Sequence, residues 1–291
     1  MAEELVGVIG GTGLGDALAE LIVDGEFCEI ETPFGRPSTA IIVGRLGLNR
    51  IAFLNRHGKG HKLIPSEVPF AANIFALKSL GVHTVIASGA VGSLREEIAP
   101  GDLVIVEQFI DKTFKRQSSF FGGFGAVHCE MTQPTCERLR KILCDTAEKI
   151  DVKTHPKGTY VCMEGPQFST RAESLMHRAW GGDLIGMTAM PEAKLAREAQ
   201  ICYALIALPS DYDCWRPAKT ETDKQALLKE IIANLQTGTK NCLELIKAVL
   251  TSESGLVCED CHCRKSLDLA VWTDQSQIAP ADKEKLKVLF E

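Results

Sequence analysis

The sequence has no run of apolar residues close to the roughly 20 that a membrane-spanning helix needs. It also has no excess of positive charge, since 32 Lys and Arg stand against 38 Asp and Glu, for a net charge of −6. A nucleic acid or an anionic membrane would favour a basic protein, so neither is expected as a partner. The acidic residues Glu3 and Glu4 lead directly into the first apolar segment, which does not look like a secretory leader. These absences predict a cytoplasmic protein.

The signatures of several enzyme classes are also missing. The glycine-rich segment Gly10–Gly15 follows a strand-like run but is not a dinucleotide fingerprint, because Asp16 stands where the last glycine belongs. No Gly-Lys-Ser/Thr follows it, which excludes a Walker loop. No serine or cysteine lies in a recognisable nucleophile elbow, and the loops described below offer no metal-ligand set. Internal repeats and low-complexity linkers are absent as well.

The sequence does contain short Val- and Ile-rich runs that alternate with longer helical patterns. The runs lack polar alternation, as expected for strands that helices cover on both faces. We therefore predict an α/β protein with one central mixed β-sheet flanked by helices on both faces, as a domain over residues 1–250 and a C-terminal extension over 251–291 that ends in a helix. The predicted strands are Leu5–Ile9, Thr39–Val43, Arg50–Leu54, Thr84–Ser88, Leu103–Gln108, Thr159–Met163, Leu184–Met187 and Ile201–Leu208. The predicted helices are Ser66–Leu80, Glu137–Ile150, Ser174–Trp180, Pro191–Gln200, Asp223–Leu250 and Asp282–Phe290.

Residues suited to binding an anion follow several of these strands. The glycine loop that carries Thr12 brings backbone N–H groups close to a ligand, although it can also be a plain tight turn. Arg56 and His57 follow the third strand, where they either bind phosphate oxygens or form a solvated basic turn. The small residues of Ser88–Gly92 leave room for a ligand. Thr188 either caps the next helix, donates to an anion at its N-terminus, or does both.

Aromatic and acidic residues follow other strands. Phe168 lies after a Gly-Pro turn, where it can stack on a flat ring, although a core position is the commoner fate of a phenylalanine. Asp211 and Asp213 flank Tyr212 just after the last apolar run. Such a pair is often only a turn, but at the carboxyl end of a strand it also suits proton transfer or recognition of a donor-rich ligand. The whole set fits a phosphate together with a heterocycle.

Several spaced segments resemble the purine nucleoside phosphorylase type 2 / methylthioadenosine phosphorylase family. The matching segments lie in the same order over about residues 5–250. They are Ile9-Gly10-Gly11-Thr12-Gly13-Leu14, Thr32-Pro33-Phe34-Gly35-Arg36-Pro37-Ser38, Arg56-His57-Gly58, Gly92-Ser93-Leu94-Arg95-Glu96-Glu97, Pro100-Gly101-Asp102, Gln108-Phe109-Ile110-Asp111, Glu164-Gly165-Pro166-Gln167-Phe168-Ser169, Met187-Thr188 and Ser210-Asp211-Tyr212-Asp213-Cys214-Trp215.

The resemblance implies the nucleoside phosphorylase fold and phosphorolysis of the N-glycosidic bond of methylthioadenosine. Inorganic phosphate is then the co-substrate, and no organic cofactor or metal is needed. By position in the motifs, the implied phosphate-binding residues are Thr12, Arg56, His57, Gly89, Ala90 and Thr188. The implied nucleoside-binding residues are Val91, Phe168, Ser169, Met187, Asp211, Tyr212 and Asp213. Ser169 and Lys224 are expected to influence specificity.

Asp211 is the hypothesised acid that protonates the departing purine, and Asp213 is its partner. A carboxyl group shielded from water has a raised pKa, which suits this proton transfer. An aspartate at position 211 also accepts a hydrogen bond from the 6-amino group of adenine, whereas relatives that use 6-oxopurines tend to carry asparagine there. The alternatives are phosphorolysis of methylthioinosine or a 6-oxopurine nucleoside, and a non-catalytic nucleoside-binding module.

The sequence departs from the family pattern at a few positions. Many relatives have a hydroxyl residue in place of Gly89, and many have asparagine in place of Gly186, where glycine is expected to enlarge the pocket or loosen its backbone. The family forms trimers or dimers of trimers, so the resemblance implies a homotrimer or a dimer of trimers. His128 matches a position that reaches across the subunit interface, although it can also be an ordinary surface histidine.

Eleven cysteines are many for a chain of 291 residues, and their odd number does not suit a secreted disulfide framework. Cys162 and Cys202 lie in apolar contexts and are expected to behave as small buried side chains. Cys258, Cys261 and Cys263 are clustered around a histidine. We expect free or redox-labile thiols here before a disulfide, which some relatives form at a C-terminal Cys-x-Cys pair, and a disulfide before a zinc site.

Overall fold

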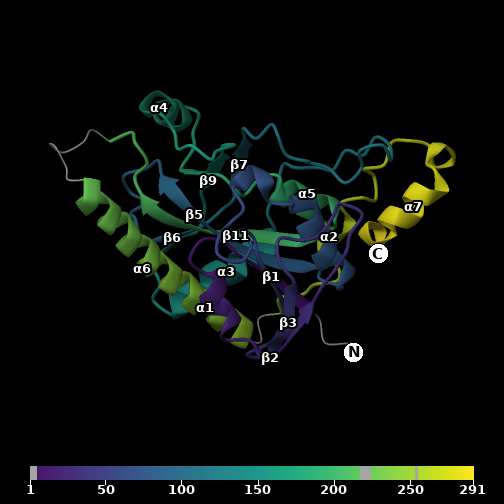
Figure 1. The fold of residues 1–291 in the computed structure, drawn as a ribbon, viewed down its shortest axis with the longest axis horizontal. Coiled ribbons are helices and arrows are strands. Elements are labelled where there is room, and N and C mark those ends of the chain that lie inside the picture. Colours follow the sequence, from purple (N-terminus) through teal and green to yellow (C-terminus); the bar gives the residue numbers. More distant parts are fainter. Residues whose placement is uncertain (1–4, 217–223, 253–254) are drawn as a thin grey trace.

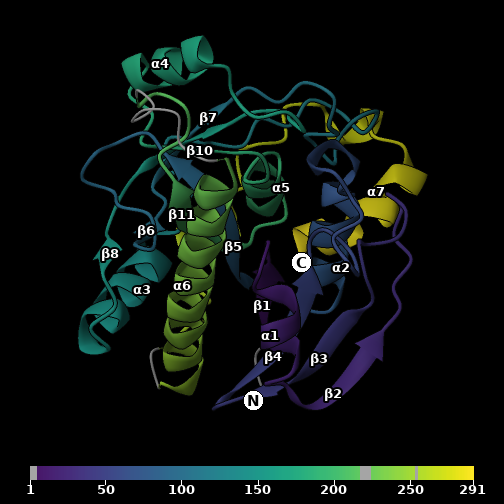
Figure 2. The ribbon, with the colours of Figure 1, turned by 60° about the vertical axis from the view of Figure 1, so that its left-hand side comes forward.

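The computed structural model describes residues 5–216, 224–252 and 255–291. A mixed β-sheet passes through the middle of the molecule, with helices packed on both faces (Figures 1 and 2). The predicted fold class is therefore confirmed. Within the described residues, no helix combines the length and the apolar character needed to cross a membrane.

The sheet has eleven strands, and its main path runs in the order β2-β3-β4-β1-β5-β10-β9-β7. Strand β11 pairs with β5 and β6, and β6 also pairs with β8. The strands are β1 (Leu5–Gly10), β2 (Val23–Cys28), β3 (Ile41–Leu46), β4 (Asn49–Asn55), β5 (Thr84–Ser93), β6 (Leu103–Ile105), β7 (Gln108–Asp111), β8 (Thr154–His155), β9 (Thr159–Cys162), β10 (Leu184–Gly186) and β11 (Cys202–Asp211).

Two hydrophobic cores lie on opposite faces of the sheet. One is built with α1 (Gly15–Ala19), α3 (Glu137–Lys149) and α6 (Lys224–Thr251), the other with α2 (Phe70–Ser79), α5 (Glu192–Glu198) and α7 (Pro280–Leu286). The two groups of helices lie on the two sides of the sheet in Figure 2. Helix α4 (Arg171–Ala179) lies at the periphery. A capping box stabilises its start, because Thr170 accepts from the Glu173 N–H and Glu173 accepts from the Thr170 N–H.

Four neighbouring strands run parallel, in the spatial order β4-β1-β5-β11. Their carboxyl ends therefore meet at one edge of the sheet, which is the usual ligand-binding position in an open α/β sheet. Strand β10 ends near the same place, because it runs antiparallel to β5 and pairs with its last residues. The loops with candidate functional residues follow these strands.

The C-terminal extension packs against the domain on both faces of the sheet. Leu256, Cys261 and Cys263 join the core of α3 and α6, whereas Leu267, Ile278 and Leu289 join the core of α2 and α5. Its last helix, α7, continues into a 3-10 turn at Lys287–Phe290, which confirms the predicted helical end. The extension thus contributes buried side chains to both cores.

Three elements were not predicted from the sequence: β2, β8 and α1. Strand β2 contains Asp24 and Gly25 and is mostly exposed, and β8 has only two residues, so neither has a strong strand pattern. The single strand predicted over Leu103–Gln108 was wrong at its end, because the structure has two strands, β6 and β7, with different neighbours. The helix predicted over Asp223–Leu250 is present as α6, which begins at Lys224, and Asp223 lies outside the described residues.

Candidate active site

The glycine loop after β1 lies directly on the middle of β5. The Gly11 N–H donates to Ser88 Oγ at 3.2 Å. A Cβ atom at Gly11 would lie 2.5 Å from Ser88 O and 3.0 Å from Arg56 Nη1, so only glycine fits this approach. The half-buried Thr12 is therefore held next to the residues that follow β4 and β5.

Arg56 is fully buried and tightly held beneath this loop. Its Nε and Nη2 atoms both donate to the Glu192 carboxylate at 2.7 Å, and its Nη1 donates to Ser88 O at 2.7 Å. Burial acts to lower the pKa of Arg56, but the carboxylate of Glu192 outweighs burial and raises it. A guanidinium has five N–H donors, so two remain for other partners. Glu192 also accepts from the Tyr203 hydroxyl at 2.8 Å, which fixes the pair further.

His57 is uncharged at neutral pH. It is 5% exposed, and burial is the main cause that lowers its pKa to about 4. Its Nδ1 lies 2.9 Å from Leu63 O, so Nδ1 carries the proton of the neutral ring and Nε2 is an acceptor. The ring stacks on His61 with 4.2 Å between centroids. His57 therefore offers an acceptor to a ligand, not a positive charge.

Thr188 lies close to the end of β5, as a shared site requires. A Cβ atom at Gly89 would lie 3.5 Å from Thr188 Oγ1, and Ala90 and Val91 follow Gly89 in the same strand. The alternative that Thr188 caps the next helix was wrong, because α5 has Pro191 as its N-cap residue. The hydroxyl of Thr188 is thus not used as a helix cap.

Gly186 does not enlarge a pocket, contrary to the expectation from the sequence. A Cβ atom at this position would lie 2.0 Å from the Tyr160 hydroxyl oxygen and 3.1 Å from a methyl group of Val91. The Tyr160 side chain is fully buried and accepts from the Thr188 N–H at 3.3 Å. Tyr160 therefore fills the space that a side chain at position 186 would need.

Arg116 and Glu164 position the loop that carries Met187 and Thr188, and sequence reasoning missed both roles. Arg116 donates to Glu164 Oε1 at 2.9 Å and, through Nη1, to the carbonyl oxygens of Met187 and Met190 at 2.6 Å each. Burial acts to raise the pKa of Glu164, but hydrogen bonds from Phe114, Ser66 and Arg116 lower it to about 2. In the sequence, the only indication of these interactions was that Lys112, Lys115 and Arg116 lie in the long loop after β7.

Asp211 and Asp213 have different surroundings. Asp211 accepts hydrogen bonds at both carboxylate oxygens, from Ser210 Oγ and from the Asp213 N–H, each at 2.7 Å. Asp213 Oδ2 is buried and has no hydrogen-bond partner among the described residues. Burial is the main cause that raises the pKa of Asp213, and the charge of Asp211 adds to it. Burial therefore favours the protonated form of Asp213, while both carboxylate oxygens of Asp211 are already engaged by protein donors.

The remaining predicted nucleoside-binding residues lie around this pair. Phe168 is 85% exposed, so it is not a core phenylalanine. Ser169 is half-buried and accepts from Cys214 Sγ at its carbonyl oxygen, at 3.2 Å, which joins it to the segment after β11. The Tyr212 ring lies 3.4 Å from the Arg216 guanidinium carbon. Lys224 begins α6, and its side chain lies outside the described residues.

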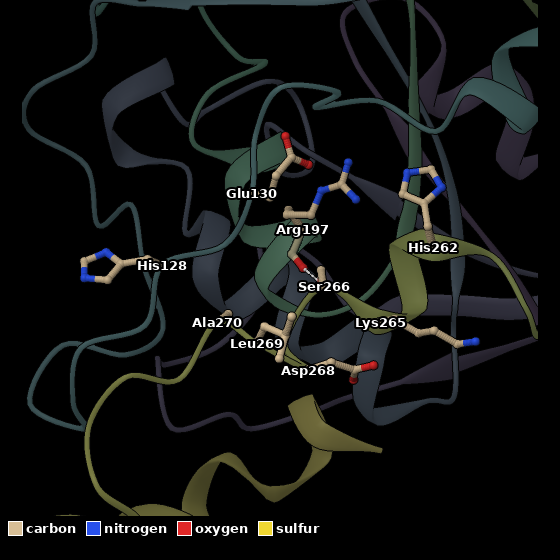
Figure 3. A pocket seen from close by; sticks show the side chains of 9 residues that line it. All are labelled: His128, Glu130, Arg197, His262, Lys265, Ser266, Asp268, Leu269 and Ala270. Carbon is tan, nitrogen blue, oxygen red and sulfur yellow. Dashed lines mark hydrogen bonds between the residues drawn. The ribbon is translucent and has the colours of Figure 1, made fainter.

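His128 lies apart from this edge of the sheet, beside the C-terminal extension. Its N–H donates to Ala270 O at 2.9 Å. It borders a cavity of about 370 Å³ that is also lined by Glu130, Arg197 and His262. Figure 3 shows the His128 ring pointing away from the other lining side chains. No strand-end residue of the candidate site lines this cavity.

Known proteins are similar to this chain in sequence and in fold. Residues 5–251 match the family model described as the phosphorylase superfamily. The S-methyl-5'-thioadenosine phosphorylase of Cereibacter sphaeroides is 47% identical over 96% of this chain and 93% of its own length. The enzyme of the same name from Gloeobacter violaceus is 45% identical over 98% of this chain and 94% of its own.

Solved structures of methylthioadenosine phosphorylases are also similar to this chain. The crystal structure of a methylthioadenosine phosphorylase from an Antarctic soil metagenomic library has a TM-score of 0.89, with 41% identity over the full length of both chains. The methylthioadenosine phosphorylase of Schistosoma mansoni, in complex with adenine, has a TM-score of 0.78 and 35% identity over 85% of this chain and 91% of its own.

Proposed function

The chain belongs to the phosphorylase superfamily, and we propose that it catalyses the phosphorolysis of S-methyl-5'-thioadenosine to adenine and 5-methylthioribose 1-phosphate. Relatives with this activity in their names are 40–47% identical to the chain over nearly its full length. One observation carries the proposal for the site. Arg56 is fixed beneath the glycine loop at the ends of β4, β1 and β5, and a carboxylate pair ends the adjacent strand β11.

Phosphate is proposed to bind between the Thr12 loop, Arg56, His57, Thr188 and the backbone of Gly89–Ala90. Arg56 keeps two N–H donors free of the bonds to Glu192 and Ser88, and its geometry is fixed before a ligand arrives. Neutral His57 accepts a hydrogen bond from the hydroxyl group of hydrogen phosphate, which keeps its proton and stays a dianion. The bound dianion stabilises the ribosyl cation character of the transition state by electrostatic attraction.

The purine is proposed to meet the Asp211–Asp213 pair, with Met187, Val91, Phe168, Ser169 and Tyr212 lining the nucleoside slot. Asp213 is buried, its Oδ2 has no hydrogen-bond partner among the described residues and its pKa is raised, which supports Asp213 as the proton donor. Asp213 then donates a proton to N7 of the departing base, and Asp211 accepts from the 6-amino group. This proposal moves the proton donor from Asp211, the acid hypothesised from the sequence, to Asp213, and it leaves the contact with the 6-amino group on Asp211.

We infer further that catalysis needs no organic cofactor and no metal, because phosphate itself supplies the charge that stabilises the transition state. A homotrimer or a dimer of trimers, with His128 at the subunit interface, and a cytoplasmic location remain parts of the proposal. The exposed Phe168 side chain suits either a purine ring or a neighbouring subunit as its partner.

A nucleoside panel at saturating phosphate tests the choice of substrate. We expect kcat/KM for S-methyl-5'-thioadenosine to exceed that for S-methyl-5'-thioinosine by about 10²-fold or more, because the Asp211 oxygen that accepts from a 6-amino group would face another acceptor in a 6-oxopurine. Adenosine, which differs only in the 5' group, measures the contribution of the methylthio group. A preference for methylthioinosine or inosine would support the 6-oxopurine alternative instead.

A further inference from the structure

Four cysteine side chains meet in the core between the sheet and helices α3 and α6. They are Cys136, Cys202, Cys261 and Cys263, and their four sulfur atoms all lie within 4.8 Å of one another. All four residues are buried, with exposed fractions of 1%, 0%, 7% and 1%. None of them belongs to the candidate active site.

The cluster joins three separate parts of the chain. Cys136 is the N-cap residue of α3, and Cys202 is the first residue of β11. Cys261 and Cys263 belong to the C-terminal extension, at the start of the 3-10 turn His262–Lys265. Only Cys261 and Cys263 are close together in the sequence, so the sequence alone does not indicate that Cys136 and Cys202 belong to the same cluster.

The distances match a metal tetrathiolate. With Zn–S bonds of about 2.3 Å, the sulfur atoms of a tetrahedral site lie about 3.8 Å apart. The Cys136 and Cys261 sulfur atoms are 3.8 Å apart. A disulfide needs an S–S distance of about 2.05 Å and joins two of the four sulfur atoms, whereas one tetrahedral metal ion engages all four at distances of this size.

The charges around the cluster also suit this site. A zinc ion with four thiolates carries a net charge of −2. Arg138 interacts electrostatically with Cys136, Cys202 and Cys261, and Arg197 interacts with Cys263. The Nε atom of Arg138 is buried and has no hydrogen-bond partner among the described residues. The N-terminal end of α3 also favours a thiolate at Cys136.

We propose that Cys136, Cys202, Cys261 and Cys263 bind one zinc ion, which fastens the C-terminal extension to the domain. Binding releases the four thiol protons and forms four Zn–S bonds, with no oxidant or reductant involved. Arg138 supports the same attachment, because its two terminal nitrogens donate to Gly255 O and Leu256 O at 2.7 and 2.8 Å. Ser266 Oγ donates to Arg197 O at 2.6 Å, which Figure 3 shows as a dashed line.

Metal analysis of the full chain tests this proposal. The protein is expressed with added zinc, purified without a chelator and measured by plasma mass spectrometry. We expect about one zinc ion per chain, as a closed tetrahedral site requires. The variants Cys202→Ser and Cys263→Ser are expected to lose zinc at least about fivefold, because a zinc thiolate site needs all its ligands. Cys258→Ser is the matched control, since Cys258 lies in the same segment but outside the cluster, and it should keep its zinc.

A second measurement keeps the test independent of how well the variants fold. The wild-type chain, with its metal replaced by Co²⁺, should show the visible absorption bands of a tetrahedral cobalt thiolate, and zinc should abolish them. Removal of the metal should lower Tm. Wild-type protein without zinc, an intact mass that shows a disulfide among these cysteines, or a Co²⁺ spectrum without thiolate bands would each overturn the proposal.

Discussion

The strand-end site and the cysteine cluster are assembled in opposite ways. Most residue groups of the strand-end site lie at or just after the end of a strand, and Gly89–Val91 lie within β5, so five short segments of the sequence are enough to indicate it. The cysteine cluster takes two residues from one segment and one each from two distant elements. A site that repeats a local pattern is therefore visible in the sequence, whereas one that depends on long-range contacts is visible only in the fold.

The two regions also differ in how they hold charge. At the strand ends, Arg56 is matched by Glu192, and Arg116 by Glu164, so positive and negative groups are buried in pairs. In the cluster, four thiols lie beside Arg138 and Arg197, and Arg138 interacts with Cys202 both electrostatically and through a hydrogen bond. The buried charges at the strand ends are thus balanced by protein groups, whereas the cluster has the donor set of a soft metal ion.

The largest expected effect is on the proton donor. Asp213→Asn should lower kcat for S-methyl-5'-thioadenosine by about 10²–10⁴-fold, because a general acid contributes that much. The KM for phosphate should change little, because the two aspartates are proposed to contact the purine and not the phosphate. Asp211→Asn should instead reduce the preference for 6-amino over 6-oxo substrates. Asp268→Asn, an exposed residue of the C-terminal extension, is the control. Unchanged turnover in both active-site variants would refute the assigned roles.

The next effect separates phosphate binding from stability. Arg56→Met leaves the Glu192 carboxylate buried without its partner, which should cost about 3–5 kcal/mol of unfolding free energy. The double variant Arg56→Met with Glu192→Met removes both charges and should recover most of that loss in a urea titration. Both the single and the double variant should lack phosphate-dependent activity. Recovery of activity in the double variant would show that Arg56 only neutralises Glu192.

A smaller effect concerns His57 and pH. Its folded pKa of about 4 lies below the ordinary value of 6.5, so the unfolded chain binds more protons between these values. Stability should be complete above pH 6.5 and should fall as the pH decreases toward 4. His57→Gln should reduce that fall by roughly 6–12 °C in Tm, because a pKa of about 4 against 6.5 corresponds to roughly 3 kcal/mol and each kcal/mol shifts the Tm of a large domain by about 2–4 °C. Parallel Tm–pH curves for the two proteins would contradict a buried neutral His57.

The smallest effect is a gain of function at a glycine. A side chain at Gly89 makes only ordinary contact with Thr188 Oγ1, so Gly89→Ser should fit and add a hydroxyl beside the phosphate. We expect the KM for phosphate to fall about threefold, as one net hydrogen bond allows. Gly186→Ala is the matched contrast, because its methyl group would collide with the Tyr160 hydroxyl and should lower Tm. A higher KM for phosphate in Gly89→Ser would contradict a phosphate site beside Gly89.

The sequence was sufficient for the fold class, for most strands and for the residues that follow them. It could not show that Glu192 binds Arg56, because 136 residues separate them and a glutamate at a helix start has an ordinary role. It also could not show that Tyr160 fills the space beside Gly186. The apolar run around Cys202 indicates only a small buried side chain, and position in space alone relates it to the three other cysteines of the cluster. Pairings between distant elements are what the structure adds.

The most direct test of the proposed function is the fate of S-methyl-5'-thioadenosine with and without phosphate. The products are followed by absorbance of the base and by phosphorus NMR of the sugar phosphate. We predict adenine and 5-methylthioribose 1-phosphate in equal amounts when phosphate is present, and almost no adenine when it is absent. Adenine release that does not depend on phosphate, or nucleoside binding without any cleavage, would contradict a phosphorolytic site at the ends of β1, β4, β5 and β11.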